Sequence, residues 1–290
     1  MRHPDPNFGY PSMSLLERER LVSRLDIHVG QGFTRQGAQV LDSHIDALSW
    51  DEAISRISGW ASSRQSRFVT LCNMHSVVTA SQDEAFHRVI AQADLALPDG
   101  APVAWALRRE GFTSQQRLSG PDLMWRYLAH AEQTGQSVFF YGSTQNTLDL
   151  LLARIQASFP ALKVVGMESP PYRELSAAED QAYVDQINQS GANVVFVGLG
   201  CPKQEAWMAA HRGRIRAVML GVGAAFDYHA GTIQRAPLWM QKSGLEWLHR
   251  LGSEPRRLFK RYLHTNSVFV WRMIKSMLVG QGSQASDQQP

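Results

Sequence analysis

The feature that most constrains the fold is a repeating alternation of short apolar runs and longer amphipathic stretches, from about Ala38 to Gly223. Strands separated by helices of this length form βαβ units, which predicts an α/β fold: a Rossmann-like, mostly parallel sheet with helices on both faces. The run 194–197 is apolar at every position, as expected of a strand that is covered on both faces. The expected strands are Arg67–Asn73, Leu95–Pro98, Ser137–Gly142, Lys163–Met167, Asn193–Gly200 and Ala217–Gly223, and the expected helices lie near 74–93, 120–134, 144–158, 176–190 and 203–212.

The chain changes character on either side of this α/β core, which we predict over residues 38–236. Residues 1–37 show no firm periodicity and are expected to form an N-terminal arm. From Pro237 onward there is no strand pattern, only helical segments interrupted at Gly244, Gly252 and Pro255. We therefore predict a helical appendage over 237–279 and a polar, disordered tail over 280–290.

Composition removes several classes of protein. With 290 residues, 44% of them hydrophobic and 19% charged, the chain is an ordinary globular one. Cys72 and Cys201 are its two cysteines, which excludes a disulfide framework and a cysteine-rich zinc module. No apolar stretch approaches the roughly 18–20 residues of a transmembrane helix. The N-terminus lacks the apolar core of a signal peptide, so we expect a cytoplasmic protein.

The net positive charge of the chain lies in the appendage. Residues 242–275 hold eight Lys and Arg against Glu246 and Glu254, whereas the net charge of the whole chain is only +3. This pattern indicates either an anionic partner or a solvated helical face. The segment 267–279 is apolar, aromatic and flanked by Arg and Lys, which suits a helix lying in the membrane interface or one packed on the body. We expect no nucleic-acid partner.

Candidate site residues follow the strands, because open α/β sheets bind ligands beyond the carboxyl ends of their strands. Thr70 and Asn73 end the first strand, where they could contact a sugar or phosphate, although Asn is also a common helix cap. Asp99 and Gly100 follow Leu95–Pro98. A carboxylate in that place could act as a general base, or the pair could form a simple Asp-Gly turn.

Two small-residue loops suit a phosphate, because backbone N–H groups at a helix N-terminus attract anions. They contain Gly142 and Ser143, and Gly198, Gly200, Lys203 and Gln204. Two such loops on one sheet suit a diphosphate-containing ligand. Asp227 follows the last strand and could shape the pocket wall. Cys201 reads as an activated thiol or, more simply, as a small buried side chain.

Several familiar motifs are missing from the sequence. There is no full G-x-G-x-x-G, P-loop, G-x-S-x-G or metal-ligand spacing of histidines. These absences argue against a dinucleotide enzyme, a P-loop NTPase, an α/β-hydrolase and a metal site. We therefore assign no cofactor and no metal.

Taken in order, the motifs resemble those of the WecG/TagA/CpsF family of bacterial glycosyltransferases, from about Val40 to Leu263. They are Asn73 with Ala80, Ala93-Asp94, Pro98-Asp99-Gly100, Arg117 with Ser119-Gly-Pro-Asp122, Tyr141-Gly142, Gly198-Leu-Gly-Cys-Pro-Lys-Gln-Glu205, Gly221-Val-Gly-Ala-Ala-Phe-Asp227, Arg235-Ala-Pro, Gly244-Leu-Glu-Trp-Leu-His-Arg250, Glu254-Pro-x-Arg257 and Arg261-Tyr-Leu.

This resemblance implies an inverting, metal-independent transfer of a sugar from a UDP-sugar to a sugar on a polyprenyl diphosphate, for bacterial surface or exopolysaccharide biosynthesis. It makes Asp99 the expected general base and places Asn73 and Gln204 in the pocket. It also implies that Arg250, Arg257 and Arg261 (or its neighbour Lys260) close over the site and stabilise the leaving diphosphate, as cations can.

The sequence departs from the family pattern at one position. Some members carry a pocket Thr two residues before the Asn that corresponds to Asn73. Here that position is Leu71, and Thr70 lies one residue earlier. A shift of one residue turns a strand side chain to the opposite face, which puts Thr70 as a donor ligand in doubt.

Two alternatives to this function remain at the level of sequence. One is a Rossmann-like nucleotide-binding oxidoreductase, which the broken glycine pattern disfavours. The other is a non-catalytic membrane-associated scaffold that uses the basic appendage. The sequence leaves the donor sugar open between a hexose and an N-acetylhexosamine, and it is compatible with a homo-oligomer.

Overall fold

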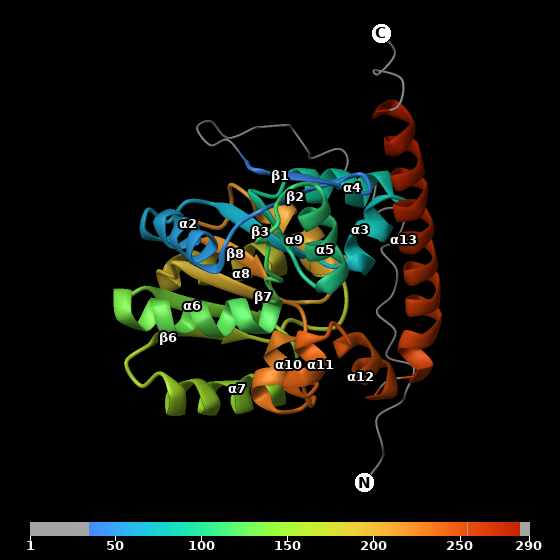
Figure 1. Ribbon diagram of the computed structural model, residues 1–290. Coiled ribbons are helices and arrows are strands. Elements are labelled where there is room, and N and C mark those ends of the chain that lie inside the picture. Colours follow the sequence, from blue (N-terminus) through green and yellow to red (C-terminus); the bar gives the residue numbers. More distant parts are fainter. Residues whose placement is uncertain (1–34, 254, 285–290) are drawn as a thin grey trace.

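The computed structural model describes residues 35–253 and 255–284, and in this part of the chain it confirms the predicted fold class. A parallel sheet of six strands has the order β4-β3-β8-β7-β5-β6 (Figure 1). Its strands are β3 (Arg67–Cys72), β4 (Leu95–Pro98), β5 (Ser137–Gly142), β6 (Lys163–Glu168), β7 (Val194–Gly198) and β8 (Val218–Gly221). Each of these elements begins and ends within a few residues of its predicted bounds.

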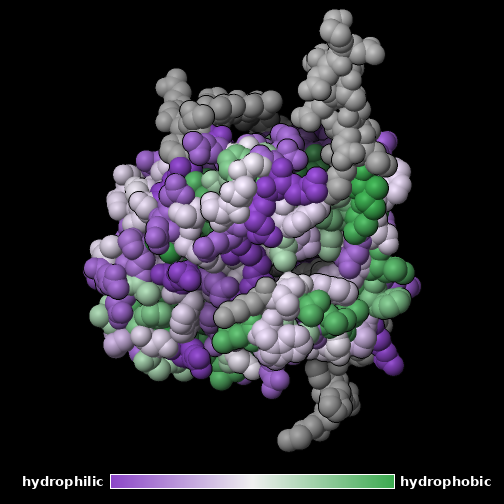
Figure 2. Space-filling view, in the orientation of Figure 1, coloured by the Kyte–Doolittle hydropathy of each residue, from purple (hydrophilic) through white to green (hydrophobic). Residues whose placement is uncertain are grey.

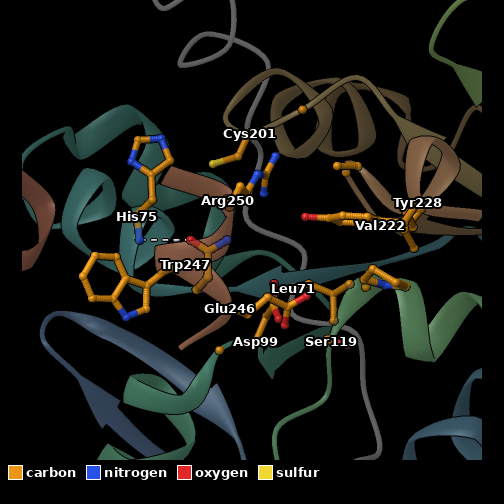
Figure 3. A pocket seen from close by; sticks show the side chains of 18 of the residues that line it. Leu71, His75, Asp99, Ser119, Cys201, Val222, Tyr228, Glu246, Trp247 and Arg250 are labelled. Atoms are coloured by element: carbon orange, nitrogen blue, oxygen red, sulfur yellow. Dashed lines mark hydrogen bonds between the residues drawn. The ribbon is translucent and has the colours of Figure 1, made fainter. Parts of the chain in front are cut away.

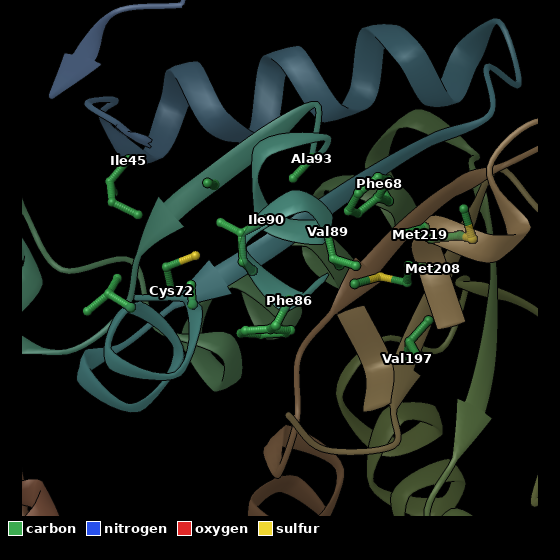
Figure 4. Packing of buried hydrophobic residues seen from close by; sticks show 14 of the residues in the cluster. Ile45, Phe68, Cys72, Phe86, Val89, Ile90, Ala93, Val197, Met208 and Met219 are labelled. Atoms are coloured by element: carbon green, nitrogen blue, oxygen red, sulfur yellow. The ribbon is translucent and has the colours of Figure 1, made fainter. Parts of the chain in front are cut away.

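Helices cover both faces of the sheet because successive strand residues point in opposite directions. In β5, Phe139 and Tyr141 enter one buried cluster, and Val138 and Phe140 enter the other. The first cluster (Figure 4) is covered by α3 (Met74–Ala80), α4 (Glu84–Ala91), α5 (Ala101–Arg109), α8 (Ala177–Ser190) and α9 (Lys203–His211). The second is covered by α2 (Trp50–Ser62), α6 (Gly120–Thr134), α7 (Gln145–Ser158) and α10 (Ala225–Ala230).

An antiparallel hairpin precedes the sheet and was not anticipated from the sequence. It consists of β1 (Gly37–Val40) and β2 (Ser43–Asp46). The buried Asp46 carboxylate accepts hydrogen bonds from the Arg35 guanidinium, at 2.6 and 2.8 Å, and from the Ala96 backbone N–H at 2.7 Å. Although burial raises the pKa of Asp46, interactions with His44, Arg35 and the Ala96 amide hold it below its usual value. This carboxylate thus ties the hairpin to β4.

The single helix expected near 74–93 is wrong, because the chain breaks into α3 and α4. Asp83 starts the second helix, and its side chain accepts the backbone N–H groups of Ala85 and Phe86. An Asp at this position satisfies amides that would otherwise have no partner at a helix N-terminus. Helix α5 was not anticipated from the sequence either.

In the part of the chain after Pro237 that the structure describes there are three helices: α11 (Leu238–Lys242), α12 (Glu246–Ser253) and α13 (Pro255–Gln284). In Figure 1, α13 stands at the side of the molecule and packs along α3. Its residues Leu258, Thr265 and Phe269 are buried, and Phe269 joins the first core cluster. No described helix is both long enough and apolar enough to cross a bilayer.

The predicted boundaries of the terminal segments can be compared only in part. Helix α13 continues past the expected boundary at residue 279, to Gln284. The rest of the tail expected over 280–290, and all but the last residues of the arm expected over 1–37, lie outside the described residues.

We predict that Gly142→Ala destabilises the fold. Gly142 has φ +123°, and a Cβ there would lie 2.6 Å from the Gly198 carbonyl oxygen on the neighbouring strand. Backbone on both sides must move, so we expect the free energy of unfolding to fall by about 1–3 kcal/mol in urea titration.

Gly59→Ala is the matched control. Gly59 lies exposed in α2 with no atom within 4 Å of an added Cβ, so the same change should stabilise by up to about 1 kcal/mol. Equal stabilities of the two variants would contradict the role of Gly142 as a close-approach residue.

Candidate active site

A cavity of about 870 Å³ opens at the carboxyl ends of β3, β4, β7 and β8, where an open α/β sheet is expected to bind its ligand. Its floor comes from the ends of these strands and the loops that follow them. Its roof comes from the C-terminal appendage. Helix α12 contributes Glu246, Trp247 and Arg250 (Figure 3), and α13 contributes Tyr262 and Thr265. A volume of this size is typical of pockets that enclose a small-molecule ligand.

Most of the predicted site residues meet in this cavity, although they come from distant parts of the sequence. Those that line it are Asn73, Asp99, Gly100, Ser143, Gly198, Gly200, Gln204, Asp227 and Arg250.

Asp99 lies at the end of β4, where its backbone N–H donates to the Cys72 carbonyl of the neighbouring strand at 3.0 Å. Its side chain lies beside Glu246 in the cavity (Figure 3). Burial raises the pKa of Asp99 to about 6, helped by the negative charge of Glu246 and opposed by the cations Arg117 and Arg250. A carboxyl group with this pKa is still mostly ionised at neutral pH, and it accepts a proton more readily than an ordinary aspartate.

Asn73 serves as both a helix cap and a neighbour of the candidate base. Its Oδ1 accepts the backbone N–H groups of His75 at 2.9 Å and Ser76 at 3.2 Å, which begins α3. Its side-chain amide also hydrogen-bonds to Asp99, which favours the ionised form of that carboxyl. The two interpretations of Asn73 offered by the sequence are therefore compatible, and the cap fixes the side chain in place.

The glycine-rich loops approach the cavity from β5 and β7. Gly198 and Gly200 line it, as does Ser143, which has φ +61°. The Ser143 N–H donates to the Gly198 carbonyl at 3.2 Å, so this amide joins the two loops. The phosphate contact expected of this loop therefore cannot use the Ser143 N–H as it is held here.

Asp227 lies on α10 and forms part of the cavity wall. Its Oδ1 accepts the hydroxyls of Thr147 at 3.4 Å and Thr232 at 3.3 Å. Burial raises the pKa of Asp227, while these two hydroxyls and the cation Arg250 lower it.

Three predicted binding residues do not line the cavity. Leu71 lines the cavity, whereas Thr70 is fully buried and lies on the opposite face of β3. This is the difference that the one-residue shift in the sequence indicated. Gly142 allows β5 and β7 to approach closely instead of contacting the cavity. Lys203 begins α9 with its Nζ 5.6 Å from the centre of the Tyr172 ring.

Of the three arginines predicted from the appendage, the structure places the side chain of one in the cavity. Arg250 lines the cavity as part of the roof that α12 contributes (Figure 3). Arg257 and Arg261 lie on α13, but their side chains are outside the described part of the structure.

A network of four charged side chains docks α12 onto the core. Glu246 accepts a hydrogen bond from Arg117 at 2.6 Å and another from Arg235 at 3.3 Å. Arg235 also binds Asp122 of α6 at 2.6 and 2.8 Å, and Arg117 approaches Asp122 at 3.7 Å. These contacts hold α12 over Asp99.

Comparison with known proteins identifies the family. The model of the glycosyl transferase WecG/TagA/CpsF family matches residues 38–283. The chain belongs to this family. It is 31% identical over 191 residues to an N-acetylglucosaminyldiphosphoundecaprenol N-acetyl-beta-D-mannosaminyltransferase of Bacillus spizizenii, covering 66% of this chain and 72% of that protein. It is 29% identical over 196 residues to the Bacillus subtilis protein of the same name, covering 67% and 74%.

Membership makes the chain a glycosyltransferase, and the oxidoreductase and scaffold alternatives lose their support. Within the described residues of this glycosyltransferase, no group of three or more His, Cys, Asp or Glu side chains is arranged to hold a metal ion.

Four further residues line the cavity of this glycosyltransferase without a role that the sequence revealed: Arg117, Glu246, Trp247 and Tyr228. The first three stood within the family motifs already quoted. Their role in closing the cavity depends on contacts such as Arg117–Glu246, which join residues 129 positions apart in the chain.

We predict that Glu246→Gln loosens α12, because it removes the anion that Arg117 and Arg235 share. Glu246 is about one-fifth exposed (21%), so the pair lies between a surface and a buried salt bridge in strength. We expect amide hydrogen exchange in 246–253 to become about tenfold faster. Glu84→Gln, which breaks the exposed pair with Arg88, is the control and should change exchange little. Unchanged exchange in α12 would show that apolar contacts alone hold the roof.

Proposed function

We propose that this glycosyltransferase moves a sugar, with inversion, from a UDP-sugar to a sugar linked to a polyprenyl diphosphate, in the synthesis of a bacterial surface or exopolysaccharide. The curated relatives, whose names describe an N-acetylmannosaminyl group and an acceptor on diphosphoundecaprenol, support this reaction and favour an N-acetylhexosamine as the donor sugar. The observation that carries the proposal is Asp99, a carboxyl of raised pKa inside a roofed cavity with arginines beside it.

In the proposed mechanism Asp99 accepts the proton of the acceptor hydroxyl. The freed oxygen attacks the anomeric carbon of the donor from the side opposite the leaving group. A new C–O bond forms while the bond from that carbon to the phosphate oxygen breaks, and UDP leaves with the bonding electron pair. Arg250 faces the cavity and Arg117 lines it, so both could stabilise the charge that develops on the diphosphate.

We predict that Asp99→Asn lowers kcat by about 10²–10⁴-fold, because the amide cannot accept the proton, while UDP affinity measured by calorimetry changes little. In the wild-type enzyme, kcat/KM should fall as the pH drops through about 6, since burial raises the pKa of Asp99 and protonation removes the base. The exposed Asp185→Asn on α8 is the control. Turnover of Asp99→Asn at the wild-type rate would refute this assignment.

The same proposal places the enzyme on the inner face of the cell membrane, where a polyprenyl acceptor would be embedded. The support is the outer face of α13, which exposes Phe259 (57%), Leu263 (60%), Trp271 (63%) and Ile274 (51%). Opposite this face, Leu258 and Phe269 are buried and Phe269 joins the core, so the helix is apolar on two sides. Figure 2 shows hydrophobic residues gathered over α13 in this view. An apolar face on a basic helix suits a position in the membrane interface.

We predict that replacing Trp271 and Ile274 together by Glu weakens binding to vesicles of phosphatidylglycerol and phosphatidylcholine by at least about tenfold, because each apolar side chain loses roughly 1.5–3 kcal/mol of burial. The control is Leu150→Glu on α7, which is also exposed (45%) but belongs to another part of the surface. Transfer to a water-soluble, short-chain acceptor should persist in both variants. Vesicle binding equal to that of the wild type would contradict the proposed contact.

A further inference from the structure

Glu205 is an acid in the cavity wall that the mechanism above does not use. It occupies the first turn of α9, its side chain is completely buried (0%), and its Oε2 has no hydrogen-bond partner. Its neighbour Gln204, 4% exposed, lines the cavity beside it. A buried carboxyl oxygen without a partner needs an explanation, because an unpaired polar atom costs free energy in the interior.

The two side chains form a short chain of hydrogen bonds. The Gly223 backbone N–H donates to Gln204 Oε1 at 3.0 Å, and Gln204 Nε2 donates to Glu205 Oε1 at 2.9 Å. The Gly223 amide can only donate, so it requires the oxygen of the Gln204 amide on its side. The orientation of the Gln204 amide is thereby fixed at both ends, and one Nε2 hydrogen is left over.

Burial favours the neutral form of Glu205. It raises the pKa of this carboxyl, while the polar side chains beside it, those of Gln204, Cys201 and Thr70, act in the opposite direction, and none of them is a cation. The Thr70 hydroxyl is also buried without a hydrogen-bond partner. A protonated Oε2 could donate to this hydroxyl, which would satisfy both orphaned oxygens.

The space around Gln204 is equally restricted. A Cβ added to Gly221 would lie 3.2 Å from Gln204 Nε2 and 2.6 Å from Met208 Cε. The glycine at the end of β8 therefore makes room for the amide in the one orientation that the hydrogen bonds select.

We propose that Glu205, in its protonated form, is a positioning residue that fixes the Gln204 side-chain amide so that its remaining Nε2 hydrogen is presented to an acceptor oxygen of the donor substrate. This inference rests on the proposed function, which supplies such oxygens in the diphosphate and in the sugar. Gln204 then acts toward the substrate only as a hydrogen-bond donor. Thr70, which was predicted as a direct ligand, instead accepts a hydrogen bond from the protonated Glu205.

The test is a double-mutant cycle with Gln204→Met and Glu205→Met, read by kcat/KM for the UDP-sugar that the wild-type enzyme accepts. Each single variant should lose about tenfold, and the double variant should lose no more than either one, because Glu205 acts through Gln204. Losses that multiply, or a single variant with wild-type kcat/KM, would overturn the proposal.

Glu205→Gln separates positioning from a general effect on folding. A Gln keeps the acceptor oxygen for Gln204 and a donor for Thr70, so it should restore kcat/KM to within about threefold of wild type, with an unchanged pH profile. If Glu205 instead acts as an anion, Glu205→Gln will be as impaired as Glu205→Met, and the proposal fails. Should Glu205→Met not fold, Thr70→Val tests the same chain: it should lower kcat/KM about threefold, and wild-type kcat/KM would refute it.

The UDP affinity of the same variants tells which oxygen Gln204 meets. A weaker affinity for UDP alone indicates the diphosphate or uridine, whereas an unchanged affinity with a raised KM for the UDP-sugar indicates the sugar; both support the inference. Glu84→Gln on the exposed side of α4 is the control for a loss of carboxylate. A wild-type enzyme that transfers no sugar from any UDP-sugar would refute the proposed function itself, a result distinct from any pattern among the variants.

Discussion

The docking of α12 over the carboxyl end of the sheet is the contact on which the rest of the site depends. Arg117 and Arg235 come from the core and the loop after α10, and both hold the carboxylate of Glu246. Without this contact the cavity would lack its roof, and Asp99 would face water, where a carboxyl keeps its ordinary pKa. The raised pKa of Asp99 is thus a property of the closed arrangement and not of the strand that carries it.

The appendage joins this site to a surface of different chemistry. The inner face of α13 packs on α3 and contributes Tyr262 and Thr265 to the cavity, and its outer face exposes large apolar side chains. A helix that served only to complete the core would have one apolar face. Because roof and outer face belong to consecutive helices, attachment of α13 to a membrane would set the cavity mouth close to a lipid-linked acceptor.

The sequence predicted the sheet and the gathering of the site residues because both follow from local pattern and a single topological rule. Strands buried on both faces are apolar throughout, and the ends of parallel strands share one edge, which brings Asn73, Asp99 and Gly198 together. That rule does not say which side of the edge a residue faces. Gly142 ends a strand as Gly198 does, yet it meets the Gly198 backbone instead of the cavity.

The parts that could not be predicted depend on contacts between distant segments. The hairpin β1–β2 is held by Asp46 and Arg35, and neither residue signals a strand on its own. The roles of Glu246 and Glu205 were also hidden. A Glu near the end of the chain gives no sign that it will lie between Arg117 and Arg235, and a Glu in the first turn of a helix usually remains in solvent, where it favours the helix dipole.

The acids of the cavity show how one kind of side chain takes different roles. Burial raises the pKa of Asp99, Asp227 and Glu205 alike, but their neighbours differ. Glu205 lies among neutral groups, where the protonated acid is favoured. The positive charge of Arg250 acts on both Asp99 and Asp227 and favours their ionised forms. Under the proposed function, a diphosphate paired with Arg250 would neutralise that cation. Binding of the donor would then raise the pKa of Asp99 further and make it a stronger base when the acceptor hydroxyl arrives.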